Sequence, residues 1–166
     1  MNQTLCLFRY NLGEKIMGKF LKEVVGTMFF KNGRLLIDKP RKRPTFQMIG
    51  GSVEEGETPL QAAIRECHEE LGQKVIFDES KFDQIMDFEE IATSDQLTHI
   101  HFYVFKYSGE LEGNLTTSEE IEKFMWFGID DDINLLSNTL KNEVVPYCIE
   151  QGLIKNIEYS HSKAIK

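Results

Sequence analysis

An amphipathic helix with both ends marked, set between β-rich segments, is the feature that most constrains how this chain can fold. Thr58 suits the capping position, Pro59 suits the first helical turn, and Gln61 completes a capping box with Thr58. Gly72 stands where a helix is expected to stop. On a helical wheel, apolar side chains fill one arc of this segment and carboxylates fill another. We therefore expect a helix from Thr58 to Leu71 that packs on one face and presents charge on the other.

Strand signals lie on both sides of this helix. Runs rich in β-branched, aromatic and other apolar residues at 24–30 and 34–38 are separated by Asn32-Gly33, a strong hairpin signal. A short strand is expected just before the Gly50-Gly51 pair, which forces a turn. The further strands predicted from composition are 46–49, 75–77, 84–88, 99–107 and 124–129. Residues 131–153 carry apolar residues at helical spacing, which predicts one or two helices with Pro146 in a first turn or at a break.

This order of elements predicts an α/β or α+β layered domain. The chain has 166 residues and 41% hydrophobic content, enough for one domain with a core. We assign 22–154 to that domain, 1–21 to an N-terminal extension of uncertain structure, and 155–166 to a polar C-terminal tail.

Cysteine usage and hydropathy indicate where the protein acts. The three cysteines form no CxxC pair and no cluster of zinc spacing, so they are typical of thiols in a reducing compartment. No apolar run approaches the roughly 20 residues of a membrane span, and none near the start is long enough for a signal-peptide core. We expect a cytoplasmic protein without a membrane partner.

The charge balance limits the class of partner. The formal net charge is −8, which argues against nucleic acid as a partner. A phosphorylated substrate would then need local cations or a metal ion. Oligomeric state cannot be read from this composition.

The acidic arc of the helix is the strongest candidate for chemistry. Glu66, Glu69 and Glu70 fall within roughly 100° of the helical wheel. Magnesium prefers hard oxygen ligands and is commonly held by a few carboxylates together with substrate phosphates. A solvated acidic face is the commoner explanation for an arbitrary ExxEE pattern, however. The three glutamates alone favour that simpler explanation.

The stretch Gly51–Gln73, GSVEEGETPLQAAIRECHEELGQ, changes that balance. It resembles the Nudix box, G-x5-E-x7-R-E-U-x-E-E-x-G-U, in which U is a bulky aliphatic residue. Every fixed glycine and charged position of the box is matched, by Gly51, Glu57, Arg65, Glu66, Glu69, Glu70 and Gly72. The departures are apolar: Cys67 and Gln73 replace aliphatic residues, and Ile49 stands where many members have proline.

The resemblance implies the Nudix fold, a mixed β-sheet sandwiched between α-helices, and a magnesium-dependent hydrolase in which Mn²⁺ can substitute. It implies Glu66, Glu69 and Glu70 as metal ligands, together with the backbone carbonyl of Gly50. Glu66, or else Glu69, would orient or deprotonate the attacking water. Gly51, Glu57, Arg65 and Gly72 would support the site, with Arg65 paired to Glu57 and able to reach Glu69.

Residues outside the box are weaker candidates for substrate binding. Arg41 and Arg43 belong to a basic loop that could hold phosphates, although such a loop also simply aids solubility. His99 and His101 share a strand face with aromatic residues that could stack a base, although core packing explains those residues equally well. Glu120 could be an additional ligand or base, or a solvated carboxylate of an acidic loop.

The function implied by the resemblance is hydrolysis of a diphosphate bond in a nucleoside diphosphate linked to a group X, by water attack on phosphorus. The expected partner is a small phosphorylated molecule of the nucleotide class. One alternative is a Nudix-like module that binds a nucleotide without turnover, but such modules typically lose box glutamates and this box is intact. Another is an isoprenoid diphosphate isomerase, which the short chain disfavours.

Overall fold

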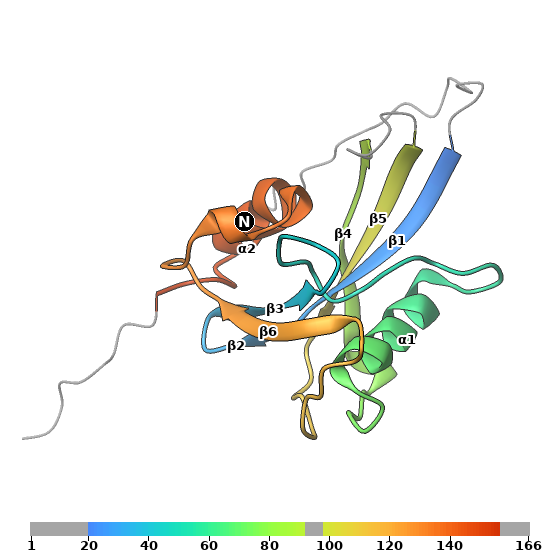
Figure 1. The fold of residues 1–166 in the computed structure, drawn as a ribbon, viewed down its shortest axis with the longest axis horizontal. Coiled ribbons are helices and arrows are strands. Elements are labelled where there is room, and N and C mark those ends of the chain that lie inside the picture. The colour runs from blue at the N-terminus through green and yellow to red at the C-terminus, as the bar shows by residue number, and fades with distance from the viewer. Residues whose placement is uncertain (1–19, 92–97, 157–166) are drawn as a thin grey trace, which may run out of the picture.

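The computed structural model describes residues 20–91 and 98–156 (Figure 1). Two three-stranded sheets form its centre. The first has the order β1-β5-β4 and contains β1 (Phe20–Met28), β4 (Phe82–Ile91) and β5 (Thr98–Tyr107). The second has the order β2-β3-β6 and contains β2 (Phe30–Lys31), β3 (Arg34–Pro40) and β6 (Ile121–Phe127). Only β1 and β5 are parallel among these pairs, so the first sheet is mixed and the second is antiparallel.

The helices lie on opposite sides of the strands (Figure 1). Helix α1 (Pro59–Leu71) buries Ala63, Cys67 and Leu71 in one core with residues of β1 and β5. Near the C-terminus, the π-helical turn η3 (Leu140–Val144) and α2 (Val145–Glu150) close a second core with residues of β3 and β6. Short 3₁₀ turns, η1 (Glu79–Lys81) and η2 (Ile133–Leu135), complete the elements. The expected α+β arrangement of sheets between helices is confirmed.

The local signals of the sequence were accurate. Thr58 caps α1, both hydrogen bonds of the capping box with Gln61 are present, and Gly72 ends the helix. Asn32 and Gly33 both have positive φ, as a two-residue hairpin turn between β2 and β3 requires. Pro146 lies in the first turn of α2. Pro146 has no N–H to donate to the preceding turn. The turn just before it, η3, has the wider hydrogen-bond pattern of a π-helix.

Two strand predictions were wrong and one was incomplete. The run expected at 24–30 is strand except at Phe29, where it is split between the two sheets and the Phe29 carbonyl accepts from the Leu36 N–H at 2.9 Å. Residues 46–49 form only isolated bridges, and 75–77 form a single bridge at Ile76. Strand propensity identified extended backbone in these places without showing which partner it would pair with.

The extended segment after β3 connects the two sheets. The Thr27 N–H donates to the Ile49 carbonyl at 2.7 Å, and the Val25 N–H donates to the Gly51 carbonyl at 2.8 Å. On the other side, the Gln47 N–H donates to the Asp38 carbonyl at 2.8 Å. These bonds hold the turn at Gly50 and Gly51 against β1, just before the loop that leads to α1.

Among the described helices, none is long and apolar enough to cross a membrane.

We predict that Gly50→Ala destabilises the protein more than Gly56→Ala. Both glycines have positive φ, so each substitution strains the backbone by about 1–3 kcal/mol. At Gly50 an added Cβ would also lie 2.1 Å from the Val25 carbonyl oxygen, whereas at Gly56 it would meet nothing within 4 Å. Urea unfolding of the two variants measures the difference. Equal losses of stability would show that the turn does not press on β1.

Candidate active site

The acidic face of α1 points toward the Gly50-Gly51 turn. The Gly50 N–H donates to a Glu70 carboxylate oxygen at 2.7 Å. A Cβ on Gly51 would lie 2.3 Å from an oxygen of Glu66, so only glycine leaves room for that carboxylate. Glu66 is largely enclosed, with 14% of its side chain exposed, and Glu69 is 53% exposed. The turn and the helix therefore form one acidic recess.

Arg65 ties this recess to the loop that leads into α1. Its guanidinium donates to both oxygens of Glu57, at 2.8 and 2.9 Å, and to the Ser52 carbonyl at 2.9 Å. The same side chain donates to Glu66 at 2.9 Å and to Glu69 at 3.4 Å. The hydrogen bond from Arg65 lowers the pKa of Glu57. The ion pair expected between Arg65 and Glu57 is thus present, and so is the reach to Glu69.

Gly72 completes the box by ending α1. Its φ is +109°, in the region that favours glycine, and its N–H donates to the His68 carbonyl at 3.1 Å. A Cβ at this position would lie 2.3 Å from the Thr116 hydroxyl. Gly72 therefore supports the helix end and takes no direct part in the recess.

Asp38 on β3 is a component that the sequence did not reveal. Its side chain is fully buried, and neither carboxylate oxygen has a hydrogen-bond donor among the described residues. Its charged neighbour is Glu70, and the two carboxyls can hydrogen-bond each other only when one of them carries a proton. Burial raises the pKa of Asp38, and burial together with Asp38 raises that of Glu70. Two neighbouring buried acids, both with raised pKa values, thus lie behind the recess.

The donor set fits a hard divalent cation. Four carboxyl groups, those of Asp38, Glu66, Glu69 and Glu70, surround or back the recess, and burial also raises the pKa of Glu66. Their oxygens are the ligand type that magnesium prefers, and the orphaned Asp38 shows that positive charge is lacking there. As the side chains stand, no group of three ligating side chains within 20–91 and 98–156 is close enough to hold an ion.

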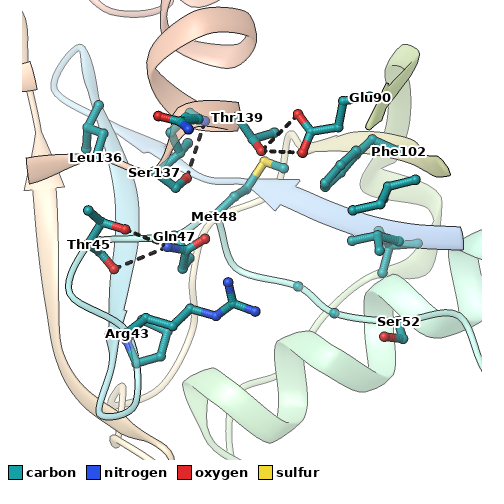
Figure 2. Close-up of a pocket in the computed structure, with 18 of the residues that line it drawn as sticks. Arg43, Thr45, Gln47, Met48, Ser52, Glu90, Phe102, Leu136, Ser137 and Thr139 are labelled. Carbon is teal, nitrogen blue, oxygen red and sulfur yellow. Dashed lines mark hydrogen bonds between the residues drawn. The ribbon is translucent and has the colours of Figure 1, made fainter. Parts of the chain in front are cut away.

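A cavity of about 800 Å³ opens from the recess between the two sheets. Gly50, Gly51 and Glu70 line it, and so do Arg43 and Glu120. Figure 2 shows the Arg43 side chain extending into this space below Gln47. The structure therefore brings Glu70 and the Gly50-Gly51 turn to one cavity with two of the outside candidates, Arg43 and Glu120, whereas Glu66 and Glu69 do not line it.

The other outside candidates lie elsewhere. Arg41 is exposed and donates to the Glu119 carbonyl at 3.0 Å, so it braces the loop before β6 without lining the cavity. His101 contacts Asp87 at 2.5 Å and stacks on Tyr103, and His99 shares their face of β5. The cavity is lined from the opposite face of that strand, by Ile100 and Phe102.

The far end of the cavity contains residues that sequence reasoning missed. Glu90 of β4 and Thr139, just before η3, are hydrogen-bonded to each other and line the cavity with Phe102 and Met48 (Figure 2). Glu90 and Thr139 are 49 positions apart in the sequence, so no local motif joins them. Strand alternation does place residues 100 and 102 on one face of β5, but it does not show which face of the strand borders the cavity.

Comparison with known proteins agrees with this geometry. An RNA pyrophosphohydrolase of Francisella tularensis subsp. mediasiatica is 48% identical to this chain over 42 residues, which are 25% of this chain and 27% of that protein. The match therefore spans only about a quarter of that relative. Among solved structures, the Burkholderia pseudomallei MutT NUDIX hydrolase superposes with a TM-score of 0.63 at 21% identity, covering 79% of this chain and 97% of that one.

The E. coli ORF135 protein gives the same TM-score, 0.63, at 18% identity and covers 80% of this chain and 92% of its own. These structural likenesses establish the fold. The family model described as NUDIX domain matches residues 21–146, most of the chain and all of the recess. The chain is therefore a member of the NUDIX domain family, the family of Nudix hydrolases.

Proposed function

We propose that this protein is a magnesium-dependent pyrophosphohydrolase that cleaves a diphosphate bond in a nucleoside diphosphate linked to a group X. The observation that carries the proposal is the acidic face of α1 packed against the Gly50-Gly51 turn, with Glu70 of that face lining a cavity that Arg43 also lines. A volume of about 800 Å³ suits a nucleotide-sized ligand. The two described free cysteines, Cys67 and Cys148, are buried thiols, in keeping with action in the reducing cytoplasm.

Nudix hydrolases generally use divalent metals, and in this chain Glu66, Glu69, Glu70 and the Gly50 carbonyl would hold the ion. When bound, magnesium supplies positive charge beside the phosphoryl oxygens and acidifies water; manganese can replace it. The Gly50 N–H donates to a Glu70 carboxylate oxygen at 2.7 Å and so links the turn to the helix.

Glu66 is our first choice for the group that orients and deprotonates the attacking water, with Glu69 as the other candidate. Glu66 stands against Gly51, and burial raises its pKa above that of an ordinary carboxylate, which makes it a stronger base. Glu69 is more exposed and is held only by the longer contact to Arg65. Water attack on phosphorus then releases two phosphorylated products.

The remaining residues position substrate and loop. Arg43 extends into the cavity and would contact phosphate oxygens. Glu120, on the same cavity wall, could accept hydrogen bonds from substrate or bound water. Arg65 is a positioning residue because its hydrogen bonds hold Glu57, Ser52 and Glu66 together.

The binding-module alternative is disfavoured because every box carboxylate is present and arranged around one recess. A triphosphorylated RNA 5′ end is a second candidate substrate, favoured by the local identity to an RNA pyrophosphohydrolase. The net charge of −8 opposes a long polyanion. A substrate panel of nucleotides and a short triphosphorylated RNA separates these cases.

We predict that Arg65→Ala lowers stability and turnover together. The variant loses hydrogen bonds to charged groups at one side chain, which should cost about 1–3 kcal/mol of unfolding free energy. Arg65→Lys should recover little, because an ammonium group cannot reproduce the two parallel bonds to Glu57. Chemical unfolding and kcat/KM are measured on both variants. Lost turnover with unchanged stability and metal affinity would instead place Arg65 directly on the substrate.

We predict that Glu70→Gln separates stability from activity. The glutamine carbonyl can still accept from the Gly50 N–H, while the substitution removes a buried acid whose pKa is raised by burial and by Asp38. Metal-free stability should therefore be unchanged or raised, whereas magnesium-dependent turnover should fall by about two or more orders of magnitude. Thermal melting with and without magnesium, together with product release, measures both.

The matched control is Glu79→Gln, a change to a glutamate of η1 that does not line the cavity. It should keep both the wild-type turnover and the magnesium-induced rise in Tm. If Glu70→Gln turns over substrate at the wild-type rate under limiting magnesium, Glu70 is not a metal ligand.

A further inference from the structure

The cavity has a second polar end, away from the box carboxylates. There the Thr139 hydroxyl donates toward the two carboxylate oxygens of Glu90, at 3.0 and 3.1 Å. Figure 2 shows this pair on the opposite side of the cavity from Arg43. Glu90 is half-buried, and desolvation raises the pKa of its carboxyl. A ligand that donates hydrogen bonds there would offset this loss of solvation.

The walls beside Glu90 are flat and apolar. Phe102 lines the cavity and stacks on Phe88, with ring centroids 5.2 Å apart and an interplanar angle of 12°. Met48 lines the space between Phe102 and Gln47 (Figure 2). Met48 can lie there because β1 has glycine at position 26, where a Cβ would come within 1.8 Å of the Met48 methyl group. A planar ring with a polar edge fits apolar walls that end in a carboxylate.

The carboxylate of Glu90 determines which hydrogen-bonding groups the edge of a bound ring must carry. An ionised carboxylate only accepts hydrogen bonds and offers about four lone-pair sites, whereas the Thr139 hydroxyl supplies one proton. The hydroxyl lies 3.0 and 3.1 Å from the two oxygens and so occupies the position between them, where a ligand with two adjacent N–H donors would replace it. Among the common nucleobases, only guanine places two N–H donors side by side on one edge, at N1 and the N2 amino group. Adenine and cytosine each place a ring nitrogen that accepts hydrogen bonds beside their amino group. This nitrogen and the carboxylate oxygen are both acceptors and would repel each other.

We propose that Glu90 selects guanine, with N1–H and the N2 amino group replacing the Thr139 hydroxyl at its two carboxylate oxygens while the base lies beside Phe102 and Met48. The proposal rests on the proposed function, since it takes the substrate to be a nucleotide with its phosphates at the Arg43 and Gly50 end of the cavity. The preferred substrate is then a guanosine diphosphate linked to X.

Binding of non-hydrolysable probes tests this without requiring turnover. The α,β-methylene diphosphates of guanosine, inosine and adenosine are titrated calorimetrically into the full chain with magnesium present. Guanosine should bind about ten- to a hundredfold more tightly than adenosine. Inosine keeps N1–H but lacks the N2 amino group, so it should fall between them. This wild-type comparison does not depend on any variant folding.

Two variants then assign the preference to one side chain. Glu90→Gln keeps an acceptor for Thr139 but turns one oxygen into a donor, so the guanosine preference should fall about tenfold or more while affinity for adenosine is retained. Glu89→Gln, a change at the exposed neighbour that does not line the cavity, should keep the full preference. A merely structural bond between Glu90 and Thr139 would leave the preference unchanged in Glu90→Gln.

Equal binding of the three probes by the wild type, preference for adenosine, binding of none of them, or a preference that survives Glu90→Gln would each overturn the proposal. Turnover of nucleotides without base preference would contradict the guanine site alone. A guanosine preference that depends on Glu90, in a protein that hydrolyses no nucleotide, would contradict the proposed function and leave the base site standing.

Discussion

The hydrogen bonds of Arg65 hold together the parts on which the proposed chemistry depends. One guanidinium joins the loop at Glu57 and Ser52 to the carboxylate of Glu66 on α1. The Gly50-Gly51 turn is fixed from the other side by backbone bonds to β1. A Cβ at Gly50 would meet the Val25 carbonyl of β1 and a Cβ at Gly51 would meet the Glu66 carboxylate, so the turn lies directly between the strand and the helix. Loop, strand and helix thus meet at one recess, and the cavity continues from it.

The same arrangement concentrates negative charge at some cost to the fold. Asp38 and Glu70 are buried near each other, and Asp38 lacks a donor among the described residues. Replacing such groups by apolar side chains would ordinarily favour stability. Their retention is explained most simply if the recess works with a cation, because positive charge there would reverse the sign of these interactions. Stability and the proposed activity therefore make opposite demands on these acids.

Local information in the sequence predicted the parts of the site that lie within one segment. The cap at Thr58 and the stop at Gly72 depend on spacings of a few residues, and the pairing of Arg65 with Glu57 was implied by the resemblance to the Nudix box. Parts that depend on tertiary pairing were not predictable in this way. The split at Phe29, the burial of Asp38 and the meeting of Glu90 with Thr139 each depend on which strands become neighbours. Both faces of β5 carry aromatic residues, so alternation alone could not tell the side of His101 from the cavity side of Phe102.

The central claim is that this protein uses water to attack phosphorus in a nucleoside diphosphate linked to X. Hydrolysis in ¹⁸O-labelled water with magnesium, followed by mass spectrometry and ³¹P NMR of the products, tests it most directly. We predict metal-dependent turnover with one labelled oxygen on a phosphate-bearing product, and the labelled product identifies which phosphorus is attacked. Absence of turnover across the nucleotide panel, or label found only on a carbon of the group X, would contradict the account.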